Sequence, residues 1–458
     1  MNERPIEPFV LDERWLAQRL GKVEASQLAA AMAGLIRSGK VPAGARLPTV
    51  RVLASSLGLS TGAVATAWSQ LRADGLVNTR RRGGTLVVDK ETAADSDALW
   101  NGNWASVDLA LGVADPALLP PLDDALAKGV RTPNLHVSYG EVMTETLLNA
   151  VRPTWPFEAE AWTTGGAGRE TMSLAIEAAA PRGDLVAIEE PTSPRVLEVV
   201  QAIGLRTVPV ACDEQGPHPD ALVAALARKP AAFIYQPRAQ VPLGHAVSAE
   251  RTEELARVMR QHGAATWVVE DDNVGPVAAA LIHSIGSYLP DRVILVRDYG
   301  PTYGVDLRTS VIGGARILVD RASKLRCYGF AMTSRILQDA LAFQIQNPEA
   351  QLAVDHARRR YALRRNLLTD ALKIRGFTVN NRDGMHVWIP VPDENAALVN
   401  LASYGVTVGA GARCFSGAPT GGHLRILTSR LPDNGAAIEQ LADLVMNAVE
   451  GKVRQGLD

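Results

Sequence analysis

Between residues 47 and 75, apolar side chains recur every three or four positions in two short blocks, which predicts two amphipathic helices. Thr49 is placed to cap the first helix, Gly58 to end it in the left-handed conformation, and Ser60 to cap the second. The apolar positions are Val52, Leu53 and Leu57 in the first helix and Val64, Trp68 and Leu71 in the second. The outward positions of the second helix are Ser60, Thr61, Gly62 and Thr66. Two helices joined by a turn with glycine are typical of a helix-turn-helix unit.

A hairpin is predicted directly after these helices. Residues 76–79 and 85–88 are β-prone, and they enclose Arg80, Arg81 and Arg82 followed by two glycines. Three guanidinium groups at a hairpin tip can contact DNA phosphates or enter a minor groove, as the wing of a winged helix does. The alternative is a solvated charge run on an ordinary hairpin, but the neighbouring helix pair favours the wing. An amphipathic helix at residues 28–36 supplies the usual first helix of such a head.

From about residue 107 onward, short uninterrupted apolar runs alternate with helical stretches. The apolar runs are residues 185–188, 231–235, 266–269 and 293–296, and the helical stretches include 194–203, 220–227 and 250–262. Runs of this kind predict parallel strands buried on both faces, hence a doubly wound α/β sheet with its ligand site at the carboxyl ends of the strands. Strand-like residues 384–390 and 423–427 predict a smaller α+β domain after a long connecting helix.

The expected organisation is a DNA-binding head at residues 1–88, a linker at 89–106, a large domain at 107–350 and a small C-terminal domain at 351–458. The head includes an extra helix around residues 15–20, and the linker sequence has little to bury. Residues 1–90 hold 13 Lys and Arg against 7 Asp and Glu, so the net charge of −2 divides into +6 there and −8 elsewhere. Positive charge therefore gathers where contacts with DNA phosphates require it.

Composition also excludes several classes of protein. No apolar run is long enough for a bilayer span, and residues 1–13 are unlike a signal peptide. The three cysteines Cys212, Cys327 and Cys414 are scattered, so neither a disulfide framework nor a zinc spacing can be built from them. We therefore expect a cytoplasmic protein without a metal site.

Three sequence strings near the N-terminus resemble the GntR-type winged helix-turn-helix over about seventy residues. They are Ile36-Arg37-Ser38-Gly39, the stretch from Pro42 to Thr49, and Gln70-Leu71 followed by Gly75-Leu76. The resemblance implies double-stranded operator DNA as a partner, with DNA contacts from Arg51, Ser60, Thr61, Thr66, Arg80, Arg81 and Arg82. The second helix departs from an arginine-reading pattern, because its first turns carry no Arg or Lys, so bidentate reading of guanine from it is not expected.

A second set of motifs follows in the body. In order they are Thr164 to Gly168, Ile188-Glu189-Glu190-Pro191, Pro237 to Gly244, Glu270-Asp271-Asp272 and Gly304 to Arg308. They look like fold-type I aminotransferases, and with the head the chain is similar to the MocR subfamily of GntR regulators, whose members are homodimers. The resemblance implies that a loop of Gly166, Ala167 and Gly168 holds the phosphate of pyridoxal phosphate. It also implies that Asp271 pairs with the pyridine nitrogen and that Arg425 binds a carboxylate.

The position of the Schiff-base lysine departs from this family. Pro301 stands there, so no internal aldimine can form at that residue. The flanking serines are replaced by Asp298 and Gly300, and an aspartate repels a phosphate. Further departures are Val241, Asn273 and the pair Thr192-Ser193. The body is therefore expected to have lost covalent pyridoxal chemistry and to serve as a dimer scaffold and sensor of a small-molecule effector.

Two alternatives stay open at this point. The chain can be a pyridoxal phosphate enzyme that uses a different lysine, of which Lys324 lies in a charged helical segment typical of solvated residues. It can also bind pyridoxal phosphate without a covalent link, through the glycine loop, Asp271 and Arg308, with Asn273 and Arg425 as further ligand-binding candidates. Asp271 is as well explained as a structural carboxylate at a strand end, and Arg308 as a packing residue.

Overall fold

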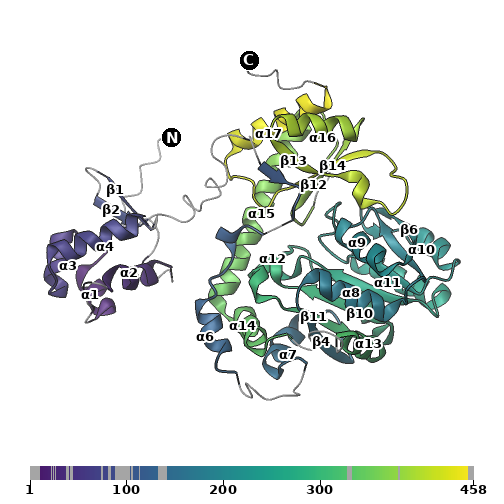
Figure 1. Cartoon of the computed structure of the whole chain (residues 1–458), viewed down its shortest axis with the longest axis horizontal. Coiled ribbons are helices and arrows are strands. Elements are labelled where there is room, and N and C mark those ends of the chain that lie inside the picture. Colours follow the sequence, from purple (N-terminus) through teal and green to yellow (C-terminus); the bar gives the residue numbers. More distant parts are fainter. Residues whose placement is uncertain are drawn as a thin grey trace. The chain divides into compact units, whose positions relative to one another are not determined.

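The computed structural model of the chain describes residues 11–21, 23, 25, 27–37, 41, 45–73, 76–80, 84–87, 104, 107–112, 114–132, 142–326, 333–379 and 382–451. The chain divides into two compact units, residues 1–97 and 98–458, here called the head and the body (Figure 1). Among the described residues, no single helix is long and apolar enough to span a membrane. One helix pair reaches that composition jointly, but it is bent by 119°.

The head contains the helices and the hairpin that the apolar pattern predicts. Its elements are α1 (Glu13–Leu20), α2 (Leu28–Arg37), α3 (Val50–Leu57), α4 (Thr61–Ala73), β1 (Val77–Arg80) and β2 (Gly84–Val87). The Thr49 hydroxyl accepts a hydrogen bond from the Val52 amide at 3.4 Å, and Gly58 ends α3 with a φ of 68°. The expected caps of α3 are thus confirmed. Val52 differs from the expectation, because its side chain is 43% exposed and lies outside the core of the head.

The body is built on a mostly parallel eight-stranded sheet, as its apolar runs predict. The strand order is β4 (Ala161–Gly165), β11 (Ser310–Gly314), β10 (Val293–Asp298), β9 (Trp267–Asp272), β8 (Ala232–Tyr235), β5 (Leu185–Glu190), β6 (Arg206–Asp213) and β7 (Gly216–Pro217). The five strands from β10 to β6 pair in parallel, and β11, β4 and β7 pair antiparallel with their neighbours. The carboxyl ends of β10, β9, β8 and β5 therefore meet at one edge of the sheet.

Helices cover both faces of this sheet, which explains why its central strands begin with uninterrupted apolar runs and carry their polar residues toward the carboxyl ends. One face packs against α8 (Gly168–Ala179), α9 (Pro194–Ile203) and α13 (Arg316–Arg326). The other face packs against α10 (Pro219–Leu226), α11 (Ala249–His262), α6 (Asp123–Gly129), α7 (Glu145–Val151) and α14 (Arg335–Gln346). Alternate residues of β5 show the division, because Val186 and Ile188 face the first helix layer while Ala187 faces the second.

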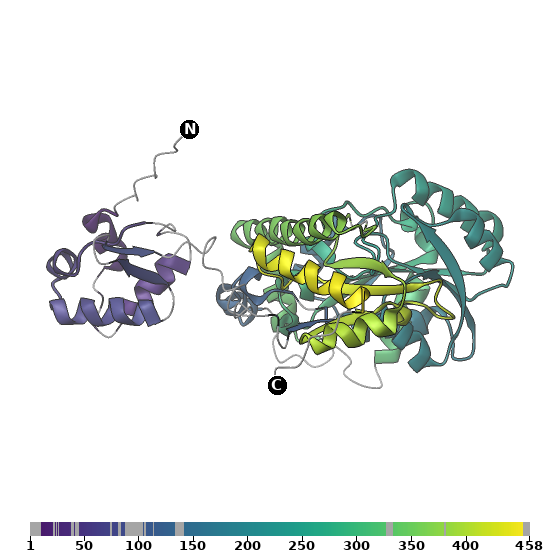
Figure 2. The ribbon, with the colours of Figure 1, turned by 90° about the horizontal axis from the view of Figure 1, so that it is seen from above.

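A smaller four-stranded sheet carries three helices. Its order is β12 (His386–Val391), β14 (Gly422–Leu427), β13 (Val406–Ala410) and β3 (Val107–Leu109). The long helix α15 (Pro348–Ile374), with α16 (Glu394–Ser403) and α17 (Gly435–Val449), packs against it in one apolar core (Figure 2). The remaining short elements are α12 (Gly300–Tyr303) and the 3-10 turns Pro116–Leu118, Arg152–Thr154, Gly275–Val277, Ile285–Ser287, Pro290–Arg292, Val305–Leu307 and Gly411–Cys414.

The domain boundaries expected from the sequence need three corrections. Val107 pairs in parallel with Val406, so β3 belongs to the small sheet and the large domain does not begin at residue 107. Trp104 lies in the segment expected to be a linker, yet it is only 5% exposed and donates its indole N–H to the Ala437 carbonyl at 3.1 Å. An indole that fills the small core fixes the chain to the body, so the segment from Trp104 onward is part of the body. Helix α15 also crosses the expected boundary at residue 350.

Candidate functional site

The glycine loop lies where the sequence predicts it, between the carboxyl end of β4 and the first turn of α8. Two carboxylates fill the space above this loop. A Cβ atom on Gly168 would lie 2.3 Å from Oδ2 of Asp298, and a Cβ on Gly166 would lie 2.4 Å from Oε2 of Glu170. The helix N-terminus that would attract an anion is therefore already faced by acidic side chains of this chain.

Asp271 forms an ion pair that sequence reasoning missed. Its carboxylate, 1% exposed at the end of β9, pairs with Nη2 of Arg195, and Nη1 of Arg195 donates to the Gly168 carbonyl at 2.9 Å. Burial raises the pKa of Asp271, and the charge and hydrogen bond of Arg195 partly offset that rise. Arg195 thus takes the partner that a pyridine nitrogen has in the related enzymes. The only sequence signal for it is a basic residue directly after the proline that opens α9.

A cavity of about 210 Å³, here called the Arg195 cavity, lies between the large and small sheets. Its walls include Ala167, Gly168, Arg195, Asn273, Asp298, Pro301, Arg308, Thr309, Met385, His386 and Leu427. Of the predicted ligand residues, the structure brings Ala167, Gly168, Asn273 and Arg308 to these walls. Gly166, Asp271 and Arg425 are not among the lining residues.

The two predicted arginines differ in their surroundings. Arg308 is exposed and takes a left-handed φ of 41°, and its side chain forms no hydrogen bond or ion pair with the described residues. It is therefore free to bind an anionic group in the Arg195 cavity. Arg425 lies on β14, half-buried, and donates through Nη2 to the Ala110 carbonyl at 3.1 Å. Its guanidinium is thus bound to the segment that follows β3, and Arg425 is not among the residues that line the cavity.

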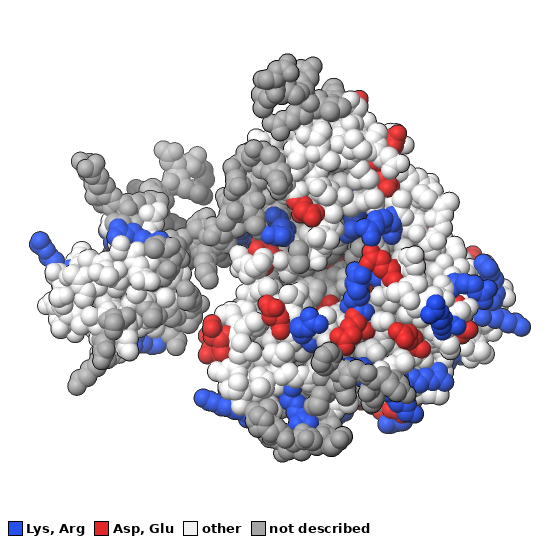
Figure 3. All heavy atoms as spheres, in the orientation of Figure 1, with Lys and Arg blue, Asp and Glu red and all other residues white. Residues whose placement is uncertain are grey.

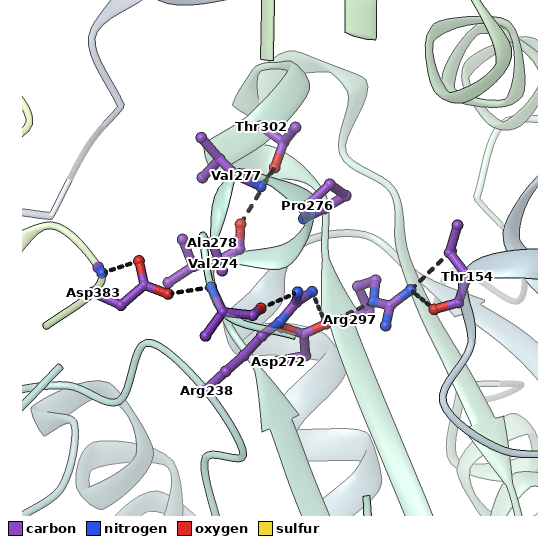
Figure 4. Close-up of polar contacts among 12 residues, drawn as sticks. Thr154, Arg238, Asp272, Val274, Pro276, Val277, Ala278, Arg297, Thr302 and Asp383 are labelled. Atoms are coloured by element: carbon purple, nitrogen blue, oxygen red, sulfur yellow. Dashed lines mark hydrogen bonds and ion pairs between the residues drawn. The ribbon is translucent and has the colours of Figure 1, made fainter. Parts of the chain in front are cut away.

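The end of β9 is held by a buried network around Asp272 (Figure 4). Arg238 donates to both carboxylate oxygens at 2.8 Å, and Nε of Arg297 donates to Oδ2 at 2.6 Å. Asp272 is fully buried, and Arg238 and Arg297 are only 9% and 2% exposed. Burial opposes ionisation of Asp272, but the two guanidinium groups hold its pKa below the usual value.

The same network connects the two sheets of the body. Arg297 donates to the carbonyl and the hydroxyl of Thr154, and Arg238 donates to the Ala280 carbonyl at 3.1 Å. The amides of Ala279 and Ala280 in turn donate to the carboxylate of Asp383, which precedes β12 (Figure 4). The network therefore fixes the strand end that carries Asp271 and Asn273 relative to the small domain.

In the head, the predicted DNA contacts that the structure describes are exposed. Arg51 lies in the first turn of α3, while Thr61 and Thr66 lie on α4. The Ser60 hydroxyl accepts from the Ala63 amide at 3.1 Å and so caps α4, as expected. Arg80 ends β1, but its side chain and the residues Arg81 and Arg82 lie outside the described part. On the face of the body shown in Figure 3, basic and acidic side chains alternate and form no continuous basic patch.

The chain has eight lysines, and none of those that the structure describes lines the Arg195 cavity. Lys324, the alternative weighed from the sequence, is exposed on α13. The cations of this chain are overwhelmingly arginines, which do not form the imine that a lysine amine forms with an aldehyde.

A winged-helix head followed by an aminotransferase-type body defines a class of regulators. Residues 24–87 match the bacterial regulatory proteins of the gntR family, and residues 132–436 match aminotransferase class I and II. The chain belongs to the aminotransferase class I and II family and, with its GntR head, to the MocR-type regulators.

Curated relatives share this organisation. The chain is 29% identical over 410 residues to the vitamin B6 salvage pathway transcriptional repressor PtsJ of Salmonella typhimurium, covering 87% of this chain and 93% of that protein. It is 26% identical over 419 residues to the pyridoxine biosynthesis transcriptional regulator PdxR of Corynebacterium glutamicum, covering 86% and 89%.

Solved structures confirm the fold of the body. A kynurenine aminotransferase from Pyrococcus horikoshii matches with a TM-score of 0.68 at 17% identity, over 78% of this chain and 94% of that one. A Thermus thermophilus aspartate aminotransferase double mutant matches with a TM-score of 0.65 at 20% identity, over 77% and 95%. These likenesses support the predicted fold-type I architecture.

Proposed function

We propose that this protein is a DNA-binding transcriptional regulator whose aminotransferase-like body serves dimerisation and effector sensing and does not catalyse transamination. The observation that carries the proposal is the combination of a GntR head with a body that has Pro301 at the position of the reactive lysine and no lysine in its cavity. Without a lysine among the described residues that line the cavity, this site offers no amine for a Schiff base with an aldehyde cofactor.

The surroundings of the glycine loop do not fit pyridoxal phosphate. The half-buried Asp298 and the exposed Glu170 place carboxylates where the family holds a phosphate, and like charges at such close range repel each other. Asp271 is already neutralised by Arg195. The names of the two relatives connect those proteins with vitamin B6. In this chain, however, Pro301 stands in place of the lysine, and the carboxylate of Asp298 lies against the loop that would bind the phosphate.

The Arg195 cavity offers another kind of ligand site. Arg308 is an unpaired cation among the described residues, and Asn273 adds an amide that can donate and accept hydrogen bonds. A small effector with one anionic group and a neutral polar part fits these two residues. Because the cavity walls come from both sheets, such an effector can favour one arrangement of the two layers, and that difference in affinity is what regulation needs.

A homodimer acting in the cytoplasm completes the proposal. A two-fold dimer presents two heads and therefore matches an operator with two half-sites. The resemblance to dimeric MocR regulators supports this assembly, and the absence of a single membrane-spanning helix among the described residues is consistent with the compartment.

The DNA contacts can be tested by binding to the promoter regions next to the protein's own gene. We expect Arg51→Ala to weaken binding about tenfold, because an exposed guanidinium at the start of α3 is lost.

We expect the triple change of Arg80, Arg81 and Arg82 to Ala to reduce the slope of log affinity against log salt by about 2 to 3, because three phosphate contacts disappear. Arg321→Ala, an exposed arginine of the body, is the matched control. Unchanged binding in both head variants would refute the assignment of contacts.

The loss of covalent cofactor chemistry can be tested on protein purified from cells supplied with pyridoxine. We expect no visible aldimine band and, after borohydride reduction, no lysine that carries a pyridoxyl group in stoichiometric amount. Pro301→Lys alone should not create the band, because Asp298 and Arg195 still occupy the site. A stoichiometric pyridoxyl group on Lys324 or on any other lysine in the peptide map would establish the enzyme alternative.

A further inference from the structure

Three side chains with metal-binding atoms meet below the edge of the large sheet, away from the Arg195 cavity. Glu189 comes from β5, Cys212 from β6 and His245 from the loop that follows β8. One oxygen, one sulfur and one nitrogen from these residues all lie within 4.8 Å of one another. Glu189 is fully buried and His245 is 3% exposed.

Three buried polar atoms of this cluster have no hydrogen-bond partner among the described residues. Oε1 of Glu189 accepts from the amide and the side chain of Gln236 at 3.0 and 2.8 Å, which fixes the carboxylate. Oε2 forms no hydrogen bond with the described residues and lies 3.9 Å from Nε2 of His245. Both ring nitrogens of His245 are also without a hydrogen bond there. Buried polar atoms in native proteins are nearly always satisfied, so three in one cluster indicate a missing partner.

We propose that Glu189, Cys212 and His245 form a binding site for a zinc ion. Thiolate, imidazole and carboxylate are the donor atoms that zinc prefers, whereas magnesium and calcium select oxygen ligands alone. Zinc bonds of about 2.0 to 2.3 Å place tetrahedral donor atoms roughly 3.3 to 3.8 Å apart, so the cluster needs to contract by about 1 Å. On binding, the thiol of Cys212 releases its proton to solvent.

The backbone around the cluster supports this assignment. Gln236 holds Glu189 from behind, as the outer partners of metal ligands usually do. Gly216, with a φ of 104°, passes close to the His245 ring, and a Cβ there would lie 3.5 Å from Nε2 and 2.8 Å from Val247. A glycine at this position therefore avoids a clash with Val247, which follows His245 in the same loop.

The fourth coordination position faces a second cavity of about 320 Å³, here called the Trp388 cavity. Cys212 and His245 lie in its wall together with Glu214, Arg382, Trp388 and His423. The rings of Trp388 and His423 are stacked with centroids 4.5 Å apart, and they form a flat wall of this cavity. Three protein ligands with an opening to a cavity are typical of zinc sites that accept water or an exogenous ligand. The proposed zinc is thus a ligand-accepting centre and not a closed structural one.

The test uses the full chain, stripped with a chelator and titrated separately with zinc and cobalt. We expect one equivalent of zinc to bind tightly. Cobalt should give a thiolate-to-metal charge-transfer band and the intense d–d bands of a four-coordinate site. Cys212→Ser should remove the charge-transfer band, and His245→Ala should lower zinc affinity at least tenfold. Cys414→Ser, which changes a buried cysteine outside the cluster, should leave both unchanged.

Several outcomes overturn the proposal. These are a wild-type chain that retains no equivalent of zinc, a cobalt spectrum without a thiolate band, or a band that survives Cys212→Ser. Loss of the band in Cys414→Ser would assign the metal to a different cysteine. The spectrum of the wild-type protein decides the question even if a variant fails to fold. Because these readouts need no DNA, they are independent of the proposed regulatory function.

Discussion

Asp272→Ala is expected to destabilise the body by about 3 to 5 kcal/mol. The carboxylate is the shared partner of Arg238 and Arg297, and its removal leaves two buried guanidinium groups without a counter-ion. The loss of stability is not confined to the end of β9. Arg238 also holds the loop at Ala280, and this loop binds Asp383 of the small domain. Urea titration followed by hydrogen exchange in peptides of β9 and β10 reports the stability of the body separately from that of the head.

The matched control for this variant is Asp320→Ala. Asp320 is an exposed aspartate of α13, so its removal should change the free energy of unfolding by no more than about 0.5 kcal/mol. A loss below about 1 kcal/mol in Asp272→Ala would contradict the assignment of the network as the element that holds β9.

Asp298→Ser is expected to raise the affinity for a phosphate ester by roughly a hundredfold, or about 2.7 kcal/mol. The carboxylate faces Gly168 and accepts hydrogen bonds from the Gly300 amide at 3.0 Å and the Ser310 hydroxyl at 3.2 Å. Two like charges about 4 Å apart repel by about 4 kcal/mol at a typical effective dielectric constant. The expected gain is smaller, because burial raises the pKa of Asp298 and so already disfavours its charged form.

Calorimetric titration with pyridoxine 5′-phosphate and with pyridoxine measures this effect without imine chemistry, since neither compound has an aldehyde. Affinity for the phosphate ester should rise and that for pyridoxine should stay unchanged. Asp306→Ser, an exposed aspartate outside the lining of the Arg195 cavity, is the control. Equal affinities of the wild type and Asp298→Ser for the ester would show that the carboxylate does not exclude phosphates.

The periodicity of apolar residues predicts most elements of this protein, because the interior strands and the amphipathic helices are long enough to show it. The stretch at residues 194–203 is a helix with the expected bounds, and Gly58 ends α3 as expected. Short segments are different. β3 has only three residues, and its partner β13 lies almost three hundred residues away, so nothing local assigns it to the small sheet.

In the candidate site, too, features set by the local sequence could be predicted, whereas contacts between distant segments could not. The apolar run at residues 266–269 places Asp271 at a strand end, whereas the glycine loop could be placed only through the resemblance to aminotransferases. The partner of Asp271 could not be predicted, since Arg195 lies 76 residues away in sequence and on another element. The proposed zinc ligands could not be predicted from the sequence for a related reason. Glu189, Cys212 and His245 come from separate segments, so no spacing motif relates them, and counting cysteines alone indicated no metal site.

Strand β12 forms part of the wall of both cavities. His386 lines the Arg195 cavity, while Trp388 and Pro390, which follow on the same face of the strand, line the Trp388 cavity. Because a hydrogen-bonded strand moves as a unit, a ligand that displaces β12 at one cavity would also shift the wall of the other cavity. If an occupant of one cavity displaces β12 and so changes affinity at the other cavity, the second occupant must change the affinity of the first by the same factor. Strand β12 would then allow the effects of two chemically unrelated ligands to combine within the body before they change the binding of DNA.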